Sequence, residues 1–270
     1  MTFKSMAEVY ATIDALRDIR RAGENGAPVP SSLPHAELPK KRELTPAQQR
    51  QQKIADLCDT YASIRGELMH ALPWVHQPKD VSFAAYEAAT PEQKKAKLVA
   101  ERFATRLMDR ILDKKNSEIG ILFVGSTGTG KTHLAKAILC ELAARKMPGF
   151  FLPVREYFDL YNSDFARGLD YPLWKIRSWL SRTPCLVIDE VGTEAWTDSR
   201  RSRLQQIIDL RAEEGLPTII TTNLLPKELA SAGAERIASR MDQRLYPVIC
   251  VWDDYRKRRA IAKMAPEEVF

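Results

Sequence analysis

The eight residues from Gly125 to Thr132 constrain the fold more than any other part of the chain. They match the phosphate-loop pattern G-x-x-x-x-G-K-[ST] at every fixed position. Glycines let the backbone wrap closely around a phosphate chain, so that successive N–H groups point inward. The octet therefore predicts a nucleotide-binding α/β fold, with the ligand held by Gly125, Ser126, Thr127, Gly128, Thr129, Gly130, Lys131 and Thr132.

The residues around the octet have the pattern that such a loop needs. Ile121–Val124 is a short apolar run that predicts a buried strand before the loop. After the loop, apolar residues recur at helical spacing: Leu134, Ala135, Ile138, Leu139, Leu142 and Ala143. We expect Lys131 to reach the β- and γ-phosphates of ATP and the Thr132 hydroxyl to hold Mg²⁺.

A second apolar run, Cys185–Ile188, ends in Asp189 and Glu190. A buried strand that delivers an acid at its carboxyl end is typical of a Walker B site. There Asp189 would hold Mg²⁺, and Glu190 would polarise the attacking water as general base. The alternative is a pair of solvated acids at a strand end, and the phosphate loop upstream favours the catalytic interpretation.

The chain divides into two predicted regions, residues 1–80 and 81–270. The first is a helical N-terminal region interrupted by a proline-rich linker over 23–43, with a second helix that starts at Thr45-Pro46 and ends before Pro73. The first helix carries an apolar stripe that its local surroundings cannot bury: Met6, Val9, Tyr10, Ile13 and Leu16. We expect this stripe to dock on a partner; the alternatives are docking on the same chain and a small core formed by the N-terminal helices. The second region alternates helices with strands, which predicts a parallel sheet covered on both faces: Ile121–Val124, Phe150–Val154, Cys185–Ile188, Thr218–Thr221 and Val248–Trp252.

Composition narrows the class of protein without naming a ligand. The chain has 270 residues, 44% of them hydrophobic, and no apolar run long enough to cross a membrane. With no signal peptide at the start, we expect a cytoplasmic protein. The net charge of +6 is compatible with nucleic acid and does not establish it. Three of the four cysteines lie in apolar patterns, so buried free thiols are expected at Cys140, Cys185 and Cys250.

Two further features concern the γ-phosphate of the nucleotide. Asn223 follows the strand Thr218–Thr221, where a polar side chain either senses the γ-phosphate or closes an Asx turn. The segment 235–244 is rich in arginine, the residue type best suited to reach a phosphate of another subunit. After the last predicted strand, residues 253–270 have room for one helix only, which predicts a reduced C-terminal lid.

Together, several motifs resemble the family of bacterial replicative helicase loaders, the DnaC family of AAA+ ATPases. The motifs are Val81-Ser82-Phe83, the phosphate loop, Val187–Gly192, Thr221-Thr222-Asn223, Glu235-Arg236, Arg240-Met241 and Trp252–Arg256. The resemblance implies a five-stranded AAA+ core. It also implies that Asn223 is the sensor 1 residue, Arg240 an arginine finger completing a neighbour's site, and Arg256 the sensor 2 arginine.

The same resemblance implies partners. They are a hexameric replicative helicase, which the N-terminal stripe would bind, and single-stranded DNA, with self-association into an ATP-dependent ring or spiral. We expect DNA contacts from Phe165, Arg167, Trp196 and Arg200, and we expect Phe158 and Tyr161 to be packed instead. The implied function is a DNA-stimulated ATPase that loads the helicase. The alternatives are a transposition helper ATPase of the IstB type acting on duplex DNA, a small-molecule kinase, and a nucleotide-gated adaptor with negligible turnover.

Overall fold

The computed structural model describes residues 44–72, 81–113, 120–147, 149–161 and 169–257. Contacts divide the chain into two units, Met1–Thr45 and Pro46–Phe270. The stripe from Met6 to Leu16 and the linker over 23–43 lie outside the described residues. The described strands and helices belong to the second unit.

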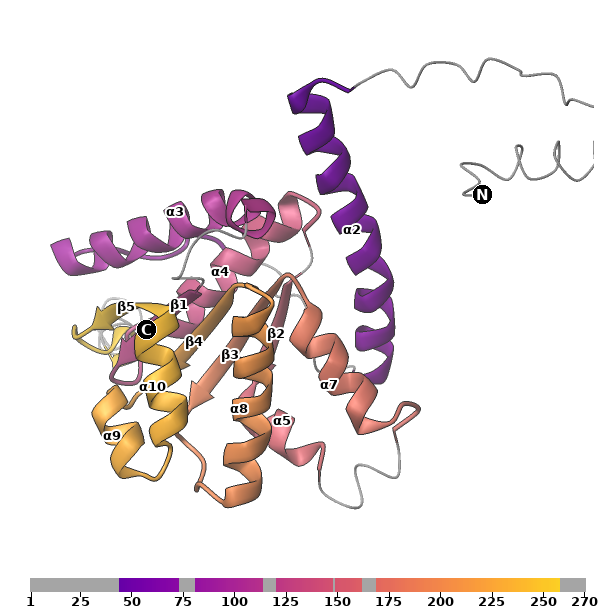
Figure 1. The fold of residues 1–270 in the computed structure, drawn as a ribbon. Helices are drawn as coiled ribbons and strands as arrows, with labels where there is room; N and C mark the ends of the chain where they lie inside the picture. Colours follow the sequence, from indigo (N-terminus) through magenta and orange to yellow (C-terminus); the bar gives the residue numbers. More distant parts are fainter. Residues whose placement is uncertain (1–43, 73–80, 114–119, 148, 162–168, 258–270) are drawn as a thin grey trace, which may run out of the picture. The chain divides into compact units, whose positions relative to one another are not determined.

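Five parallel strands form one sheet in the order β2-β3-β4-β1-β5 (Figure 1). The strands are β1 (Gly120–Gly125), β2 (Gly149–Pro153), β3 (Cys185–Val191), β4 (Thr218–Thr222) and β5 (Leu245–Cys250). The predicted five-stranded parallel sheet is therefore confirmed. The bounds of the last strand were wrong, because β5 begins at Leu245 beside Gly120 and ends at Cys250, before Trp252.

Helices cover both faces of this sheet, which makes a three-layer sandwich (Figure 1). They are α2 (Pro46–Ala71), α3 (Pro91–Asp113), α4 (Lys131–Ala144), α5 (Val154–Asp159), α7 (Leu173–Arg182), α8 (Asp198–Glu213), α9 (Pro226–Ser231) and α10 (Glu235–Arg244). Helices α3 and α4 pack on one face, while the carboxyl end of α2 with α5, α7, α8, α9 and α10 packs on the other.

Alternation along each strand builds two separate cores. In β1, Leu122 and Val124 belong to the cluster under α8 and α10, whereas Ile121 and Phe123 belong to the cluster under α3 and α4. All four side chains are buried. A strand covered on both faces reads as a continuous apolar run, which is why the sequence pattern located β1, β3 and β4 well.

Helix α2 belongs to the sheet unit by its contacts. Leu68, Ala71 and Leu72 are buried in the same cluster as the strands, and Ile64 packs against it. The division found in the contacts therefore falls at Thr45, ahead of the boundary expected at residue 81. The sequence predicts the helix itself and assigns it to the N-terminal region, whereas its carboxyl end packs in the sheet domain.

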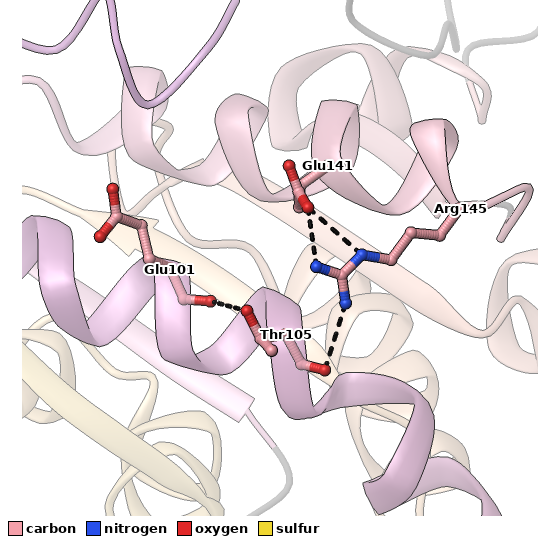
Figure 2. A network of polar contacts seen from close by, with 4 residues as sticks. All are labelled: Glu101, Thr105, Glu141 and Arg145. Carbon is pink, nitrogen blue, oxygen red and sulfur yellow. Dashed lines mark hydrogen bonds and ion pairs between the residues drawn. The ribbon is translucent and has the colours of Figure 1, made fainter.

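Helices α3 and α4 are joined at their outer surface by a small polar network (Figure 2). Arg145, just after α4, donates to the Glu141 carboxylate at 2.8 Å and to the main-chain oxygen of Thr105 at 3.3 Å. The Thr105 hydroxyl in turn donates to the Glu101 carbonyl at 2.9 Å. Because these groups are exposed, the network contributes little to the stability of the fold.

A buried arginine lies at the end of the sheet where strands β3 and β4 begin. Arg211 on α8 is fully buried, and its guanidinium donates to the Thr218 hydroxyl at 2.9 Å. It also donates to main-chain oxygens at the end of α7 and before β4: Leu180 at 3.0 Å, Ser181 at 3.4 Å, Thr183 at 2.7 Å and Pro217. Carbonyls at a helix carboxyl end lack intrahelical partners, so Arg211 caps α7 from a neighbouring helix.

The four cysteines are free thiols. Cys185 and Cys250 are buried as expected, while Cys140 is only partly buried. Among the described residues, no helix has the length and apolar content to cross a membrane.

Candidate active site

The phosphate loop joins β1 to α4, as the sequence predicts. Gly130 caps α4 with φ of 87°, and Gly128 has φ of 79°, both in the left-handed region that favours glycine. A Cβ at Gly130 would come within 2.7 Å of the Tyr86 ring, and one at Gly128 within 1.8 Å of the Asp254 carboxylate. The backbone conformation therefore favours glycine at these two positions, and a side chain there would in addition displace Tyr86 or Asp254.

Lys131 is the first residue of α4 and lies inside the loop. Its side chain is 7% exposed, and its ammonium donates to the main-chain oxygens of Gly125 and Ser126, each at 2.7 Å. Burial lowers the pKa of Lys131, while the nearby carboxylates of Asp189 and Glu190 act in the opposite direction. The ammonium is thus held at the amino terminus of α4, where its charge and the helix dipole both favour an anion.

Asp189, at the end of β3, meets the other side of the loop. Its carboxylate oxygen Oδ1 accepts hydrogen bonds from the Thr132 hydroxyl at 3.0 Å and the Thr221 hydroxyl at 2.6 Å. Burial raises the pKa of Asp189, and these two hydroxyls partly offset the effect. One carboxylate beside a hydroxyl at a phosphate loop suits Mg²⁺, which keeps several waters and takes phosphate oxygens as ligands.

No group of three or more His, Cys, Asp or Glu side chains suited to a metal occurs in the described part of the chain. An all-protein metal cage is therefore absent there. The pair Thr132 and Asp189 fits a cation shared with a nucleotide instead.

Glu190 is exposed and lines the same cleft as the phosphate loop. Its backbone has φ of 62°, in the left-handed region that few residues other than glycine adopt. The pairing of β3 with β4 is irregular between Ile188 and Val191, so a bulge lies at Glu190. The bulge breaks the alternation of the strand and presents the Glu190 side chain at its carboxyl end.

A cleft of about 340 Å³ brings most of the predicted residues together. It is lined by the phosphate loop, Glu190, Asn223 and Arg256, the last from the segment after β5. The Asn223 amide lies 3.4 Å from the Thr127 hydroxyl of the loop. Asn223 therefore reaches the nucleotide cleft from β4, the strand between the one that carries the loop and the one that carries the acids.

The segment after β5 crosses over the phosphate loop. The Trp252 indole N–H donates to the Thr129 main-chain oxygen at 2.8 Å, and the Tyr255 N–H donates to that of Gly128 at 3.0 Å. The Tyr255 hydroxyl donates to the Glu87 carboxylate at 2.8 Å. The sequence singled out Trp252–Arg256 only as a motif, and no local pattern could show that it holds the loop.

Part of the lining of the cleft was missed by sequence reasoning. Val81, Ala85, Tyr86 and Gln93 line it together with Trp252. Their mixture of apolar surface and polar groups suits a nucleobase. The signal lay in the Val81-Ser82-Phe83 motif, which begins this segment of the chain.

Arg240 lies outside the cleft. It is on α10, and its Nε donates to the Asp209 carboxylate of α8 at 2.7 Å. The Arg240 side chain is 43% exposed. Within one subunit it therefore does not reach the phosphate loop's cleft.

The predicted DNA contacts are only partly in view. Phe165 and Arg167 lie outside the described residues. Trp196 packs edge-on against Phe158 at 6.4 Å between ring centroids, and its indole nitrogen is buried. The Arg200 guanidinium lies over the same ring at 5.3 Å and pairs with Glu194 at 3.7 Å. Phe158 is 4% exposed and Tyr161 packs against the core, which confirms that these two are packed.

The fold and the site define a class of protein. Five parallel strands in this order, a phosphate loop after β1 and an acid pair at the carboxyl end of β3 form an AAA+ nucleotide-binding core. A family model, described as IstB-like ATP binding protein, matches residues 68–249, and the chain belongs to that family.

Within the class, the chain is similar to replicative helicase loaders. It is 33% identical over 139 residues to the replicative helicase loader DnaC of Escherichia coli (strain K12), a match that covers 51% of this chain and 56% of that relative. The chain thus matches little more than half the length of that relative.

Two solved structures agree with this similarity. A DnaC helicase loader structure shares 27% identity at a TM-score of 0.53, covering 63% of this chain and 97% of that one. A DnaI structure shares 27% identity at a TM-score of 0.52, covering 65% and 90%. The predicted resemblance to this family is confirmed.

Proposed function

We propose that this protein is an ATP-dependent loader that places a hexameric replicative DNA helicase onto single-stranded DNA. The observation that carries the proposal is the cleft that unites the phosphate loop with Glu190, Asn223 and Arg256, in a chain similar to helicase loaders. The Trp252–Arg256 segment, which closes over the loop, is the most specific part of that resemblance.

In the proposed reaction, ATP is the substrate and water the nucleophile. The loop N–H groups and Lys131 hold the phosphates, and Glu190 accepts a proton from the attacking water. Thr132 and Asp189 would hold Mg²⁺, which neutralises charge between the β- and γ-phosphates. Asn223 and Arg256 line the cleft where the γ-phosphate would lie, so that they contact ATP and lose that contact with ADP.

We assign Arg240 to the site of a neighbouring subunit. Its place on α10, away from its own cleft, and its half-exposed guanidinium support a role in trans. In that arrangement ATP-bound subunits assemble side by side in a ring or spiral, and each Arg240 completes the next subunit's site. Exchange of ATP for ADP would loosen the assembly.

The partners follow from the same proposal. The apolar stripe Met6, Val9, Tyr10, Ile13 and Leu16 would bind the helicase. Single-stranded DNA would contact Phe165 and Arg167, with Trp196 and Arg200 in the segment that follows the acid pair. Trp174 on α7 is a further stacking candidate, because it is 65% exposed and lies next to Lys175 and close in sequence to Arg177.

Size-exclusion chromatography of this chain with a hexameric replicative helicase, with and without ATP and in the absence of DNA, tests the proposal. We expect co-elution that requires residues 1–22 and survives in a variant with Trp174→Ala. Co-elution that persists after deletion of residues 1–22 would contradict the assignment of the stripe. Failure to co-elute under any nucleotide condition would contradict the loader function itself.

Two variants test the ATP site. Lys131→Ala is expected to abolish nucleotide binding, because it removes the only lysine of the loop. Arg240→Ala is expected to lower the ATPase rate while leaving ATP affinity nearly intact. A monomer that hydrolyses ATP at the normal rate with Arg240→Ala would contradict the shared site.

The second candidate is a transposition helper ATPase that acts on duplex DNA with a transposase. It is favoured by the description of the matching family, IstB-like ATP binding protein, over residues 68–249. Such a protein would use the same ATPase site and would differ in its partner. Stable co-purification with a transposase, and preference for duplex over single-stranded DNA, would select it.

A further inference from the structure

The backbone of Glu190 is held from both sides by threonine hydroxyls. Its N–H donates to the Thr221 hydroxyl oxygen at 2.9 Å, and its carbonyl accepts from the Thr193 hydroxyl at 2.9 Å. Between them, Glu190 has φ of 62°. A residue other than glycine stays in this conformation only when its surroundings determine it strongly, and such strain gathers at functional sites.

Thr221 also contacts the other acid. The same hydroxyl that accepts from the Glu190 N–H donates its proton to Asp189 Oδ1 at 2.6 Å. Thr221 is 1% exposed, so no bulk water competes for either bond. Since a hydroxyl has one proton, donation to Asp189 turns its lone pairs toward the Glu190 N–H. The two bonds therefore support each other.

The position of Thr221 follows from the order of the strands. β4 lies between β3, which carries the acids, and β1, which carries the phosphate loop. Parallel strands end at the same edge, so a hydroxyl at the end of β4 can reach the last residues of β3. The bulge at Glu190 then brings the N–H of that residue, rather than a side chain, against Thr221.

We propose that Thr221 and Thr193 are positioning residues that hold Glu190 in its left-handed conformation and so aim its carboxylate at the attacking water. Thr221 in addition ties the Glu190 backbone to the orientation of the Asp189 carboxylate. The proposal rests on the proposed ATP hydrolysis, because it concerns the geometry of the general base. In this proposal both threonines act through the acids rather than on the substrate, although Thr221 also lines the cleft.

A neighbouring threonine provides a matched comparison. Thr222 is on the same strand and equally buried, and its hydroxyl donates to the Val191 main-chain oxygen at 2.6 Å. It touches neither Asp189 nor Glu190 in the hydrogen bonds found for the described residues. Thr221→Val and Thr222→Val remove the same group at the same depth, so they separate positioning from loss of stability.

The test is steady-state ATPase kinetics of Thr221→Val, Thr221→Ser, Thr193→Val and Thr222→Val. We expect kcat to fall about tenfold or more in Thr221→Val with KM nearly unchanged, because a misplaced base costs rate rather than binding. In Thr193→Val the kcat should fall less, since Thr193 is exposed and the Glu190 N–H keeps its hydrogen bond to Thr221. Thr221→Ser should restore kcat to within about threefold of wild type, and Thr222→Val should keep it to within about threefold.

A second measurement does not depend on turnover. Amide hydrogen exchange at Glu190 should speed up about tenfold or more in Thr221→Val and stay close to wild type in Thr222→Val. If the wild-type chain binds ATP without hydrolysing it, the proposed function fails, and the exchange rates still decide whether Thr221 holds Glu190. Equal kcat in Thr221→Val and wild type, equal exchange in the two, or equal loss in Thr221→Val and Thr222→Val would overturn the proposal.

Discussion

Replacement of Arg211 by methionine tests how the edge of the sheet opposite the active site is held. The guanidinium is fully buried and donates to main-chain oxygens that close α7 and precede β4. Methionine fills similar volume and removes the charge but cannot donate. The carbonyls of Leu180, Ser181 and Thr183 would then lose this donor. The Thr218 hydroxyl keeps the Leu216 oxygen as a partner at 3.3 Å, and the Pro217 carbonyl keeps the Leu186 N–H at 3.3 Å.

The size of the effect follows from those three carbonyls. A buried polar group left without its partner costs about 1 kcal/mol or more, so three cost about 3 kcal/mol. Removal of a buried charge returns part of its desolvation cost, and burial indeed lowers the pKa of Arg211 to about 10. Charge-assisted bonds are worth about 1.5–3 kcal/mol each, which outweighs that return and leaves the variant about 3 kcal/mol less stable.

Urea denaturation followed by circular dichroism measures this loss, and thermal denaturation should show a fall of about 2–4 °C per kcal/mol for a domain of this size. Arg201→Met is the matched control on the same helix, because Arg201 pairs with Asp198 at the surface and should cost about 1 kcal/mol or less. An Arg211→Met variant within about 1 kcal/mol of wild type would refute the reasoning, since desolvation would then cancel the hydrogen bonds.

Three further predictions concern the site. Asp189→Asn should abolish hydrolysis and raise the melting temperature of the nucleotide-free protein at pH 7. Burial raises the pKa of Asp189, so ionisation of this carboxyl lowers the stability of the folded state as pH rises through that pKa, and asparagine avoids this loss. The gain should vanish at acidic pH, where wild type is protonated too, and a gain independent of pH would contradict this cause. Trp252→Phe should weaken ATP binding about 5–10-fold by calorimetry, because it removes the hydrogen bond to the Thr129 oxygen, and an unchanged Kd would count against it. Glu190→Gln should bind ATP normally and hydrolyse it about 100-fold more slowly. A Glu190→Gln variant whose ATPase rate equals that of wild type would instead support a nucleotide-gated adaptor.

Much of the fold could be predicted because its signals are local. The glycines of the phosphate loop, the apolar run of β1 and the acids after β3 each lie within a few residues of one another. Both sheet faces are covered, so the strands appear in the sequence as unbroken apolar runs. The start of β5 was missed because the arginine-rich α10 leads directly into it at Leu245, with no turn residues between them.

The rest depends on pairs that are far apart in the chain. Trp252 meets Thr129, Arg211 meets Leu180, and Arg240 turns to Asp209 instead of the cleft of its own subunit. Periodicity gives no distance between separate elements, so it could not predict these contacts. For the same reason the helix signals of α2 could not reveal that its carboxyl end packs in the sheet domain.

By itself the sequence determined that the chain has a phosphate loop after a buried strand, an acid pair after another, and a parallel sheet to carry them. These follow from backbone geometry and side-chain alternation, which act over a few residues. Only the tertiary structure decided which groups meet at the carboxyl ends of the strands. The strand order puts the Thr221 hydroxyl between Asp189 and the strained backbone of Glu190, and that order is set by packing across the whole domain.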